Sequence, residues 1–271
     1  MIKASLIISF YNNIAFLKFI VAGLERQTFK DFEIIIADDG SNQESIERIE
    51  QLSLGTSFSI KHIWQEDKNF RKNKILNKAI QVASSDYLIF IDGDCVPHPY
   101  FVQEHFAHKQ IGVCYTGRRV NLSPDFTSRL SESNIRNGYF ESHNFSLIKD
   151  GLFGKSYDVE KGFYTTSPFM RKFLNRKKRG ILGSNFSIHK SDILKINGFD
   201  ERYEGPSVGE DSDIQYRLEL IGIKIKSLKY IAIQYHLYHN YQKRPQENLD
   251  LFAKVKTNAV SFTPFGIIKE K

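Results

Sequence analysis

Cysteine, tryptophan and long apolar runs are scarce in this chain of 271 residues. Its two cysteines, Cys95 and Cys114, are too few for a disulfide framework and fit a reducing compartment. No run approaches the roughly 18 uncharged apolar residues that span a bilayer, so the sequence predicts no transmembrane enzyme. Strand-like sequence follows Met1 almost at once and leaves no room for a signal peptide, so we expect a cytoplasmic protein.

Several motifs of nucleotide-binding and hydrolytic enzymes are also missing. The sequence has no G-x-x-x-x-G-K-[ST] phosphate loop, no G-x-G-x-x-G and no G-x-S-x-G elbow. These absences argue against P-loop enzymes, kinases, dinucleotide-binding enzymes and α/β-hydrolases. Two distant cysteines also argue against a structural zinc site.

Positive charge is in modest excess, with 38 Lys and Arg against 31 Asp and Glu, for a net charge of +7. The densest basic run is residues 171–179 (RKFLNRKKR). Such a run could bind phosphate, an anionic membrane or nucleic acid, or be a solvated loop. The embedded Phe173 and Leu174 favour a membrane surface or an amphipathic acceptor. Because the charge is not interleaved with aromatics in a nucleic-acid-binding pattern, we expect no nucleic-acid partner.

Strand and helix patterns alternate along the first third of the chain. Short apolar runs predict buried strands at residues 4–9 and 32–37, further strands are expected at 60–64 and 87–91, and apolar residues at helical spacing lie between them. Strands that are apolar throughout and alternate with helices indicate an α/β domain with a mostly parallel central sheet flanked by helices. Further strands are expected at 223–228 and 231–235, and a helix at 248–255.

Acidic clusters fall directly after two of these strands, where ligands of open parallel sheets bind. Residues 38–41 (DDGS) follow one strand and residues 92–94 (DGD) follow another. Two carboxylates separated by glycine suit a hard divalent cation that bridges phosphates, although a plain Asp-Gly turn has the same sequence. In the first cluster a carboxylate can accept a hydrogen bond from a nucleobase, while Ser41 can cap the next helix.

Two later clusters could join such a site. Residues 210–213 (EDSD) open a predicted helix, where acidic side chains either complement the helix dipole or place a general base in a cleft. His236 and His239 lie at the end of a strand, and imidazole is a good ligand for borderline divalent ions. Histidines of this kind are more often ordinary structural residues, so the pair gains weight only beside a carboxylate metal site.

Taken in order and spacing, these motifs resemble the family 2 glycosyltransferases of the GT-A fold. The resemblance covers about residues 4–240 and rests on the segments 5–12, 27–41, 92–94, 183–188, 197–201 and 209–213. The last three are similar to the acceptor half of galactosyltransferase-like and chondroitin-polymerase-like members. Residues 74–77 (KILN) replace the usual Ala-Arg-Asn stretch, and no tryptophan precedes Glu210, so these positions depart from the family pattern.

The resemblance implies a single GT-A, Rossmann-like domain in which each candidate residue has a role. Residues 1–118 would form the nucleotide-sugar-binding half, 119–245 a smaller acceptor-binding and catalytic half, and 246–271 a tail with a helix. Tyr11 would lie against uracil, Asp39 would accept its N3 hydrogen, and Arg71 would reach a carbonyl. The other donor contacts would be Asp92, which binds ribose or assists the metal, and Gly183, Ser184 and Asn185, which line the sugar pocket.

The same resemblance implies the chemistry. Asp94 and His236, with His239 as the alternative, would ligate Mn²⁺ or Mg²⁺. Asp211 would be the general base, with Glu210 beside it. The implied reaction is inverting transfer of a hexose or N-acetylhexosamine from a UDP-sugar to a saccharide or polyprenyl-diphosphate-linked acceptor in surface polysaccharide synthesis. The enzyme would act in the cytoplasm, with peripheral contact to the anionic inner face of the cell membrane.

Two other functions remain open on the sequence. A metal-dependent nucleotidyl or phosphoryl transferase also places carboxylates at a sheet edge, and it would release pyrophosphate rather than a nucleoside diphosphate. A basic nucleic-acid-binding protein is the second alternative.

Overall fold

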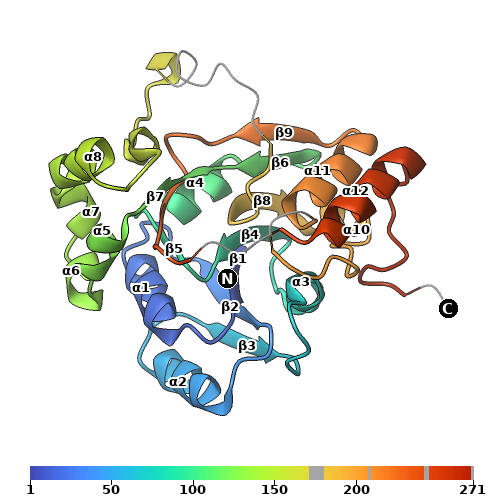
Figure 1. The fold of residues 1–271 in the computed structure, drawn as a ribbon, viewed down its shortest axis with the longest axis horizontal. Helices are drawn as coiled ribbons and strands as arrows, with labels where there is room; N and C mark the ends of the chain where they lie inside the picture. The colour runs from blue at the N-terminus through green and yellow to red at the C-terminus, as the bar shows by residue number, and fades with distance from the viewer. Residues whose placement is uncertain (171–179, 207–208, 241–243, 270–271) are drawn as a thin grey trace.

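A central sheet of seven strands, in the order β3-β2-β1-β4-β8-β6-β9, organises the molecule (Figure 1). The computed structural model describes residues 1–170, 180–206, 209–240 and 244–269. The strands are β1 (Ala4–Phe10), β2 (Phe32–Asp38), β3 (Ile60–Trp64), β4 (Tyr87–Asp92), β6 (Val113–Thr116), β8 (Asn185–His189) and β9 (Lys224–Ser227).

Strands β1 to β4 pair in parallel, as the apolar runs predict, and β6 also pairs in parallel with β9. β8 runs antiparallel to both β4 and β6. Because parallel strands end at the same edge, the carboxyl ends of β1, β2 and β4 lie together. The predicted α/β class with a mostly parallel sheet is confirmed.

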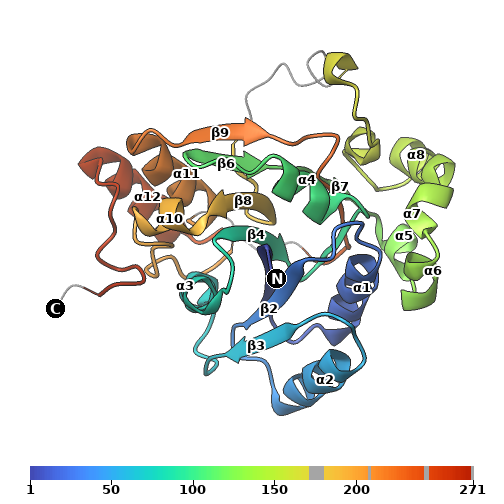
Figure 2. The ribbon, with the colours of Figure 1, turned by 180° about the vertical axis from the view of Figure 1, so that it is seen from behind.

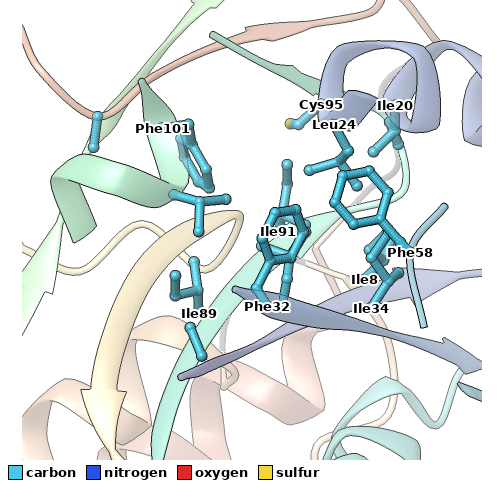
Figure 3. Close-up of a cluster of buried hydrophobic side chains, with 14 of the residues drawn as sticks. Ile8, Ile20, Leu24, Phe32, Ile34, Phe58, Ile89, Ile91, Cys95 and Phe101 are labelled. Carbon is cyan, nitrogen blue, oxygen red and sulfur yellow. The ribbon is translucent and has the colours of Figure 1, made fainter. Parts of the chain in front are cut away.

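Helices cover both faces of this sheet (Figures 1 and 2). One face carries α1 (Ile14–Glu25), α2 (Gln43–Leu54) and α4 (Phe101–Ala107), and the other carries α3 (Lys72–Val82), α10 (Lys190–Leu194) and α11 (Asp211–Leu220). Neighbouring residues of a strand point to opposite faces, so Ile8 joins the first core and Ile7 the second. In the first core Ile8 and Ile91 lie near Leu24 of α1 (Figure 3).

A smaller sheet sits beside the edge where β4 ends. It contains β5 (Cys95–Pro97), β10 (Ile233–His236) and β7 (Arg118–Asn121), in that order. The antiparallel register pairs His236 with Cys95, and the main-chain N–H of Leu237 donates to the carbonyl of Asp94 at 2.8 Å. This pairing brings the end of β10 next to the second acidic cluster.

Short helices fill the segment between β7 and β8. They are α5 (Pro124–Ser128), α6 (Glu132–Arg136), α7 (Tyr139–Ser142), α8 (Asn144–Phe153) and the 3₁₀ helix η1 (Val159–Gly162). In Figure 1 the four α-helices form a green group beside β7 and α1. Phe126 and Phe140 pack there against Tyr235 of β10, which anchors the group to the smaller sheet.

The tail contains α12 (Gln246–Asn258). The central sheet contains strands from before residue 118 and also β8 and β9 from after it. The predicted division of the chain into two halves at this residue stays a prediction. The basic run 171–179 lies outside the described residues, and its predicted contacts remain predictions too. Among the helices within the described ranges, none has the length and apolarity needed to cross a bilayer.

Candidate active site

A cleft of about 1180 Å³ opens where β1, β2 and β4 end. This volume suffices for a ligand larger than a typical drug, since small-molecule pockets span roughly 300–1,000 Å³. Ten of the predicted site residues line it: Tyr11, Asp39, Asp92, Asp94, Gly183, Ser184, Glu210, Asp211, His236 and His239. The folded chain thus collects motifs that lie some 230 residues apart in sequence into one cleft.

Asp39 is held rigidly just beyond the end of β2. Its Oδ1 accepts a hydrogen bond from Gln65 Nε2 at 2.6 Å, and its Oδ2 accepts one from the main-chain N–H of Arg71 at 2.6 Å. Burial raises the pKa of Asp39. Gly40 follows with φ +99°, and a Cβ there would lie 2.5 Å from the Cα of Asp67, so this tight turn requires glycine.

The structure places the side chain of Arg71 away from the other predicted site residues. Its guanidinium donates to the carbonyl of Glu66 and is not among the groups lining the cleft. Arg71 instead contributes through its main-chain N–H, which fixes Asp39. Tyr11 does line the cleft, with 52% of its surface exposed, and its hydroxyl donates to Asp67 Oδ2 at 3.0 Å.

Asn185 is also placed differently from the prediction. Its side chain is fully buried: Oδ1 accepts from the N–H of Gly117 at 3.1 Å, and Nδ2 donates to the carbonyl of Ala232 at 3.0 Å. These bonds tie β8 to the neighbouring strands, so Asn185 supports the cleft wall from behind. Gly183 does line the cleft, where a Cβ would lie 2.6 Å from Glu210 Oε1.

Asp94, His236 and His239 converge at one edge of the cleft. Asp94 Oδ2 lies 3.0 Å from His239 Nε2 and 3.4 Å from His236 Nε2, and one ligand atom from each residue lies within 4.8 Å of the others. Burial alone would raise the pKa of Asp94, but hydrogen bonds from both imidazoles outweigh it and hold that pKa well below its usual range. The bond to Asp94 raises the pKa of His239.

This donor set fits a divalent cation. One carboxylate and two imidazoles suit a borderline ion such as Mn²⁺ better than Mg²⁺, which prefers oxygen ligands. The sequence treats the two histidines as alternatives, whereas the structure brings both to the same oxygen of Asp94.

Lys72 is a site residue that sequence reasoning misses. Its Nζ lies 2.6 Å from Asp92 Oδ1 and 2.6 Å from Glu210 Oε2, with only 13% of the side chain exposed. Burial alone would lower the pKa of Lys72, but the two carboxylates raise it well above its ordinary value. The ammonium therefore stays charged and joins the end of β4 to the start of α11. Nothing in the local sequence pairs this lysine with those carboxylates.

The acidic cluster at the start of α11 divides into two parts. Glu210 and Asp211 line the cleft, and burial raises the pKa of each of them. Asp213 is buried elsewhere and accepts a hydrogen bond from Arg217 Nε at 2.7 Å. Two carboxylates are thus available for chemistry, while the third holds the helix in place.

The mostly parallel sheet with helices on both faces has the fold of the GT-A glycosyltransferases, as the similarity to solved structures shows. The profile described as "Glycosyl transferase family 2" matches residues 5–176, well over half of the chain, so the chain belongs to this family. A second profile, described as "N-terminal domain of galactosyltransferase", matches residues 168–240. The predicted family is confirmed.

Over most of its length the chain is similar to named bacterial enzymes. The chain is 27% identical over 229 residues to validoxylamine A glucosyltransferase of Streptomyces hygroscopicus subsp. jinggangensis, covering 81% of this chain and 52% of that protein. It is 26% identical over 239 residues to chondroitin synthase of Escherichia coli, covering 86% of this chain and 34% of that protein. The chain therefore spans about half or less of the length of these relatives.

Solved structures show the same fold at low identity. GalNAc-T7 with UDP, GalNAc and Mn²⁺ has a TM-score of 0.64 and 16% identity, over 94% of this chain and 48% of that one. A mannosyltransferase from Pyrobaculum calidifontis with GDP-Man and Mn²⁺ has a TM-score of 0.58 and 11% identity, over 88% of this chain and 57% of that one.

Proposed function

We propose that this protein transfers a hexose or N-acetylhexosamine from a UDP-sugar to a hydroxyl of a saccharide or lipid-diphosphate-linked acceptor, with inversion at the anomeric carbon. The observation that carries this proposal is that one cleft brings together the candidate metal ligands around Asp94 and the candidate base Asp211. The family membership supports transfer of a sugar. A relative from Campylobacter jejuni, named a GalNAc(5)-diNAcBac-PP-undecaprenol beta-1,3-glucosyltransferase, supports a lipid-linked acceptor in glycan synthesis.

The nucleotide end of the cleft suits a base that carries an N–H donor. The exposed ring of Tyr11 offers a face for stacking, and the fixed carboxylate of Asp39 offers a hydrogen-bond acceptor. Uracil presents such a donor at N3. In this proposal Asp92 contacts the ribose, while Gly183 and Ser184 line the sugar pocket.

Asp94, His236 and His239 would hold the divalent cation. When bound, the cation supplies positive charge that stabilises the departing diphosphate. Lys72 adds a fixed positive charge in the same cleft, since its ammonium lies between Asp92 and Glu210.

Asp211 acts as the general base. As the acceptor oxygen forms its bond to the anomeric carbon, the bond from that carbon to the diphosphate oxygen breaks, and the hydroxyl proton passes to the Asp211 carboxylate. Attack opposite the leaving group inverts the anomeric configuration in one displacement without a covalent intermediate. Glu210 lies beside the base and is positioned by Lys72.

Removing the Asp94 carboxylate is expected to weaken UDP binding. We predict that Asp94→Ala lowers the UDP affinity in Mn²⁺ by at least about 10- to 100-fold, since loss of a mere outer-shell partner of a metal ligand already has an effect of this size. His236→Ala and His239→Ala should each have an effect of the same kind. Isothermal titration of UDP in Mn²⁺, repeated in EDTA, measures the effect.

The matched control is Asp86→Ala, an exposed aspartate just before the opposite end of β4. It should bind UDP as the wild type does. An Asp94→Ala variant with unchanged affinity in Mn²⁺ would show that Asp94 holds no cation.

Two partner predictions remain proposals. Contact with the anionic inner face of the membrane depends on residues 171–179, which lie outside the described ranges. The expected lack of a nucleic-acid partner rests on the charge pattern alone.

A further inference from the structure

A second hollow of about 450 Å³ opens beside the main cleft. Four residues line both spaces: Arg119, Asn121, Tyr157 and Leu182. The volume falls within the range of roughly 300–1,000 Å³ that is typical of small-molecule sites. A ligand in the main cleft can therefore continue into the second hollow past these residues.

Asn121, the last residue of β7, has an unused hydrogen-bond acceptor at this junction. The residue is only 5% exposed, and its Nδ2 donates weakly to Asp158 Oδ2 at 3.4 Å. Its Oδ1 is buried and has no hydrogen-bond partner among the described residues. Because a buried acceptor without a partner costs free energy, a ligand hydroxyl that donates to Asn121 Oδ1 would be bound favourably.

Tyr157 presents an exposed aromatic ring at the same place. Its side chain is 60% exposed, yet its main chain exchanges two hydrogen bonds of 3.0 Å with Asn121. Aromatic faces carry partial negative charge and attract the C–H groups on the apolar face of a sugar ring. The single tryptophan of the chain, Trp64, donates to the carbonyl of Ser41 and does not line either space.

Two of the three cations that line the second hollow have close carbonyl or carboxylate partners, while the third, Arg119, donates a long hydrogen bond of 3.4 Å to Ser184 Oγ. Arg118 donates to the carbonyls of Gly117 and Gly180, and Lys161 forms an ion pair with Asp158. A hollow with an aromatic face, a side-chain amide oxygen that lacks a partner in the described part of the chain, and close partners for two of its three cations suits a polyhydroxylated ring, to whose hydroxyls Arg119 can also donate, better than a free anion.

We propose that the second hollow is an acceptor subsite, in which a sugar ring next to the reacting ring stacks on Tyr157 and donates a hydroxyl hydrogen bond to Asn121 Oδ1. This inference rests on the function proposed for the neighbouring cleft. It adds the class of acceptor, a saccharide of at least two sugars rather than a single one.

Saccharide binding to the full chain with UDP and Mn²⁺ present tests this subsite directly. The single-sugar probes are the methyl glycosides of glucose, N-acetylgalactosamine and glucuronic acid. The disaccharide probes are cellobiose, lactose and the unsulfated chondroitin disaccharide. Saturation-transfer NMR measures the binding of each probe. We expect a disaccharide to bind the wild type, and Tyr157→Ala to weaken that binding at least tenfold. Affinity for the single sugars should stay unchanged.

Two control variants separate stacking from general damage. Tyr157→Phe keeps the ring and should bind the disaccharide like the wild type. Phe145→Ala removes an 80% exposed aromatic ring of α8 that lines neither space, and it should also have no effect.

Three results would contradict the proposed subsite: no disaccharide binds, Tyr157→Ala leaves the disaccharide affinity unchanged, or Tyr157→Ala lowers the affinity for single sugars by the same factor. Displacement of the disaccharide by millimolar inorganic phosphate would also overturn it, since that result identifies an anion site. UDP titration in Mn²⁺ reports on the main cleft separately. A wild-type protein that does not bind UDP would contradict the proposed function, while Tyr157-dependent disaccharide binding would still support the subsite.

Discussion

Replacing Asp211 by asparagine is expected to lower the turnover number by about 10²- to 10⁴-fold, the usual contribution of a general base. The amide keeps the size of the side chain at the start of α11 but cannot take the proton of the acceptor hydroxyl. UDP and metal binding should therefore stay intact. Steady-state transfer rates, measured beside UDP titration in Mn²⁺, check both halves of this prediction.

The wild type should also show the pH dependence of a buried base. Burial raises the pKa of Asp211 above that of an ordinary carboxyl. Because the base works only when deprotonated, the rate is highest above this raised pKa and falls as the pH drops through it. Asp211→Asn should lose that acidic limb of the pH–rate profile.

Asp125→Asn is the matched control for Asp211→Asn. Asp125 is an exposed aspartate in the first turn of α5 and does not line the cleft. Its replacement should leave turnover unchanged. An Asp211→Asn enzyme with near-normal turnover would mean that another group accepts the proton.

Replacing Lys72 by methionine is expected to lower the free energy of unfolding by about 3–5 kcal/mol, as when one partner of a buried ion pair is removed. The substitution leaves Asp92 and Glu210 as two largely buried carboxylates without the ammonium that lies 2.6 Å from each. Urea denaturation measures the loss. Transfer should also fall, because Glu210 loses the contact that positions it.

A double variant makes the origin of this loss clear. Adding Glu210→Gln to Lys72→Met removes one of the two unpaired charges and should restore part of the stability. Lys74→Met, on the same helix but outside the cleft, is the control and should unfold near the wild-type midpoint. If Lys72→Met behaved like Lys74→Met, the ion-pair bridge would contribute nothing to stability.

The parts of the fold that sequence predicts well are those with local causes. The apolar runs of β1, β2 and β4 favour burial in a parallel sheet that helices cover on both faces, and in such a sheet their carboxyl ends meet at one edge. The position of the acidic clusters at that edge follows directly. Membership of glycosyl transferase family 2 follows from their order and spacing.

Side-chain direction and long-range pairing are harder to predict. Asn185 follows two cleft-lining residues, but its own side chain points into the strand junction, and the side chain of Arg71 turns to Glu66. Lys72 meets Glu210 across 138 positions of the chain, since 210 − 72 = 138. Such contacts depend on how the two parts of the chain pack, and no local pattern encodes them.

The most direct test of the proposed function is a donor panel with nucleotide release as the readout. The full chain is incubated with Mn²⁺, saccharide and lipid-diphosphate acceptors, and UDP-, GDP- or dTDP-sugars, alongside nucleoside triphosphates. We predict acceptor-dependent release of UDP from a UDP-hexose or UDP-N-acetylhexosamine, abolished by EDTA and by Asp211→Asn. Release of pyrophosphate from a triphosphate, or turnover of GDP- or dTDP-sugars alone, would contradict the proposed function.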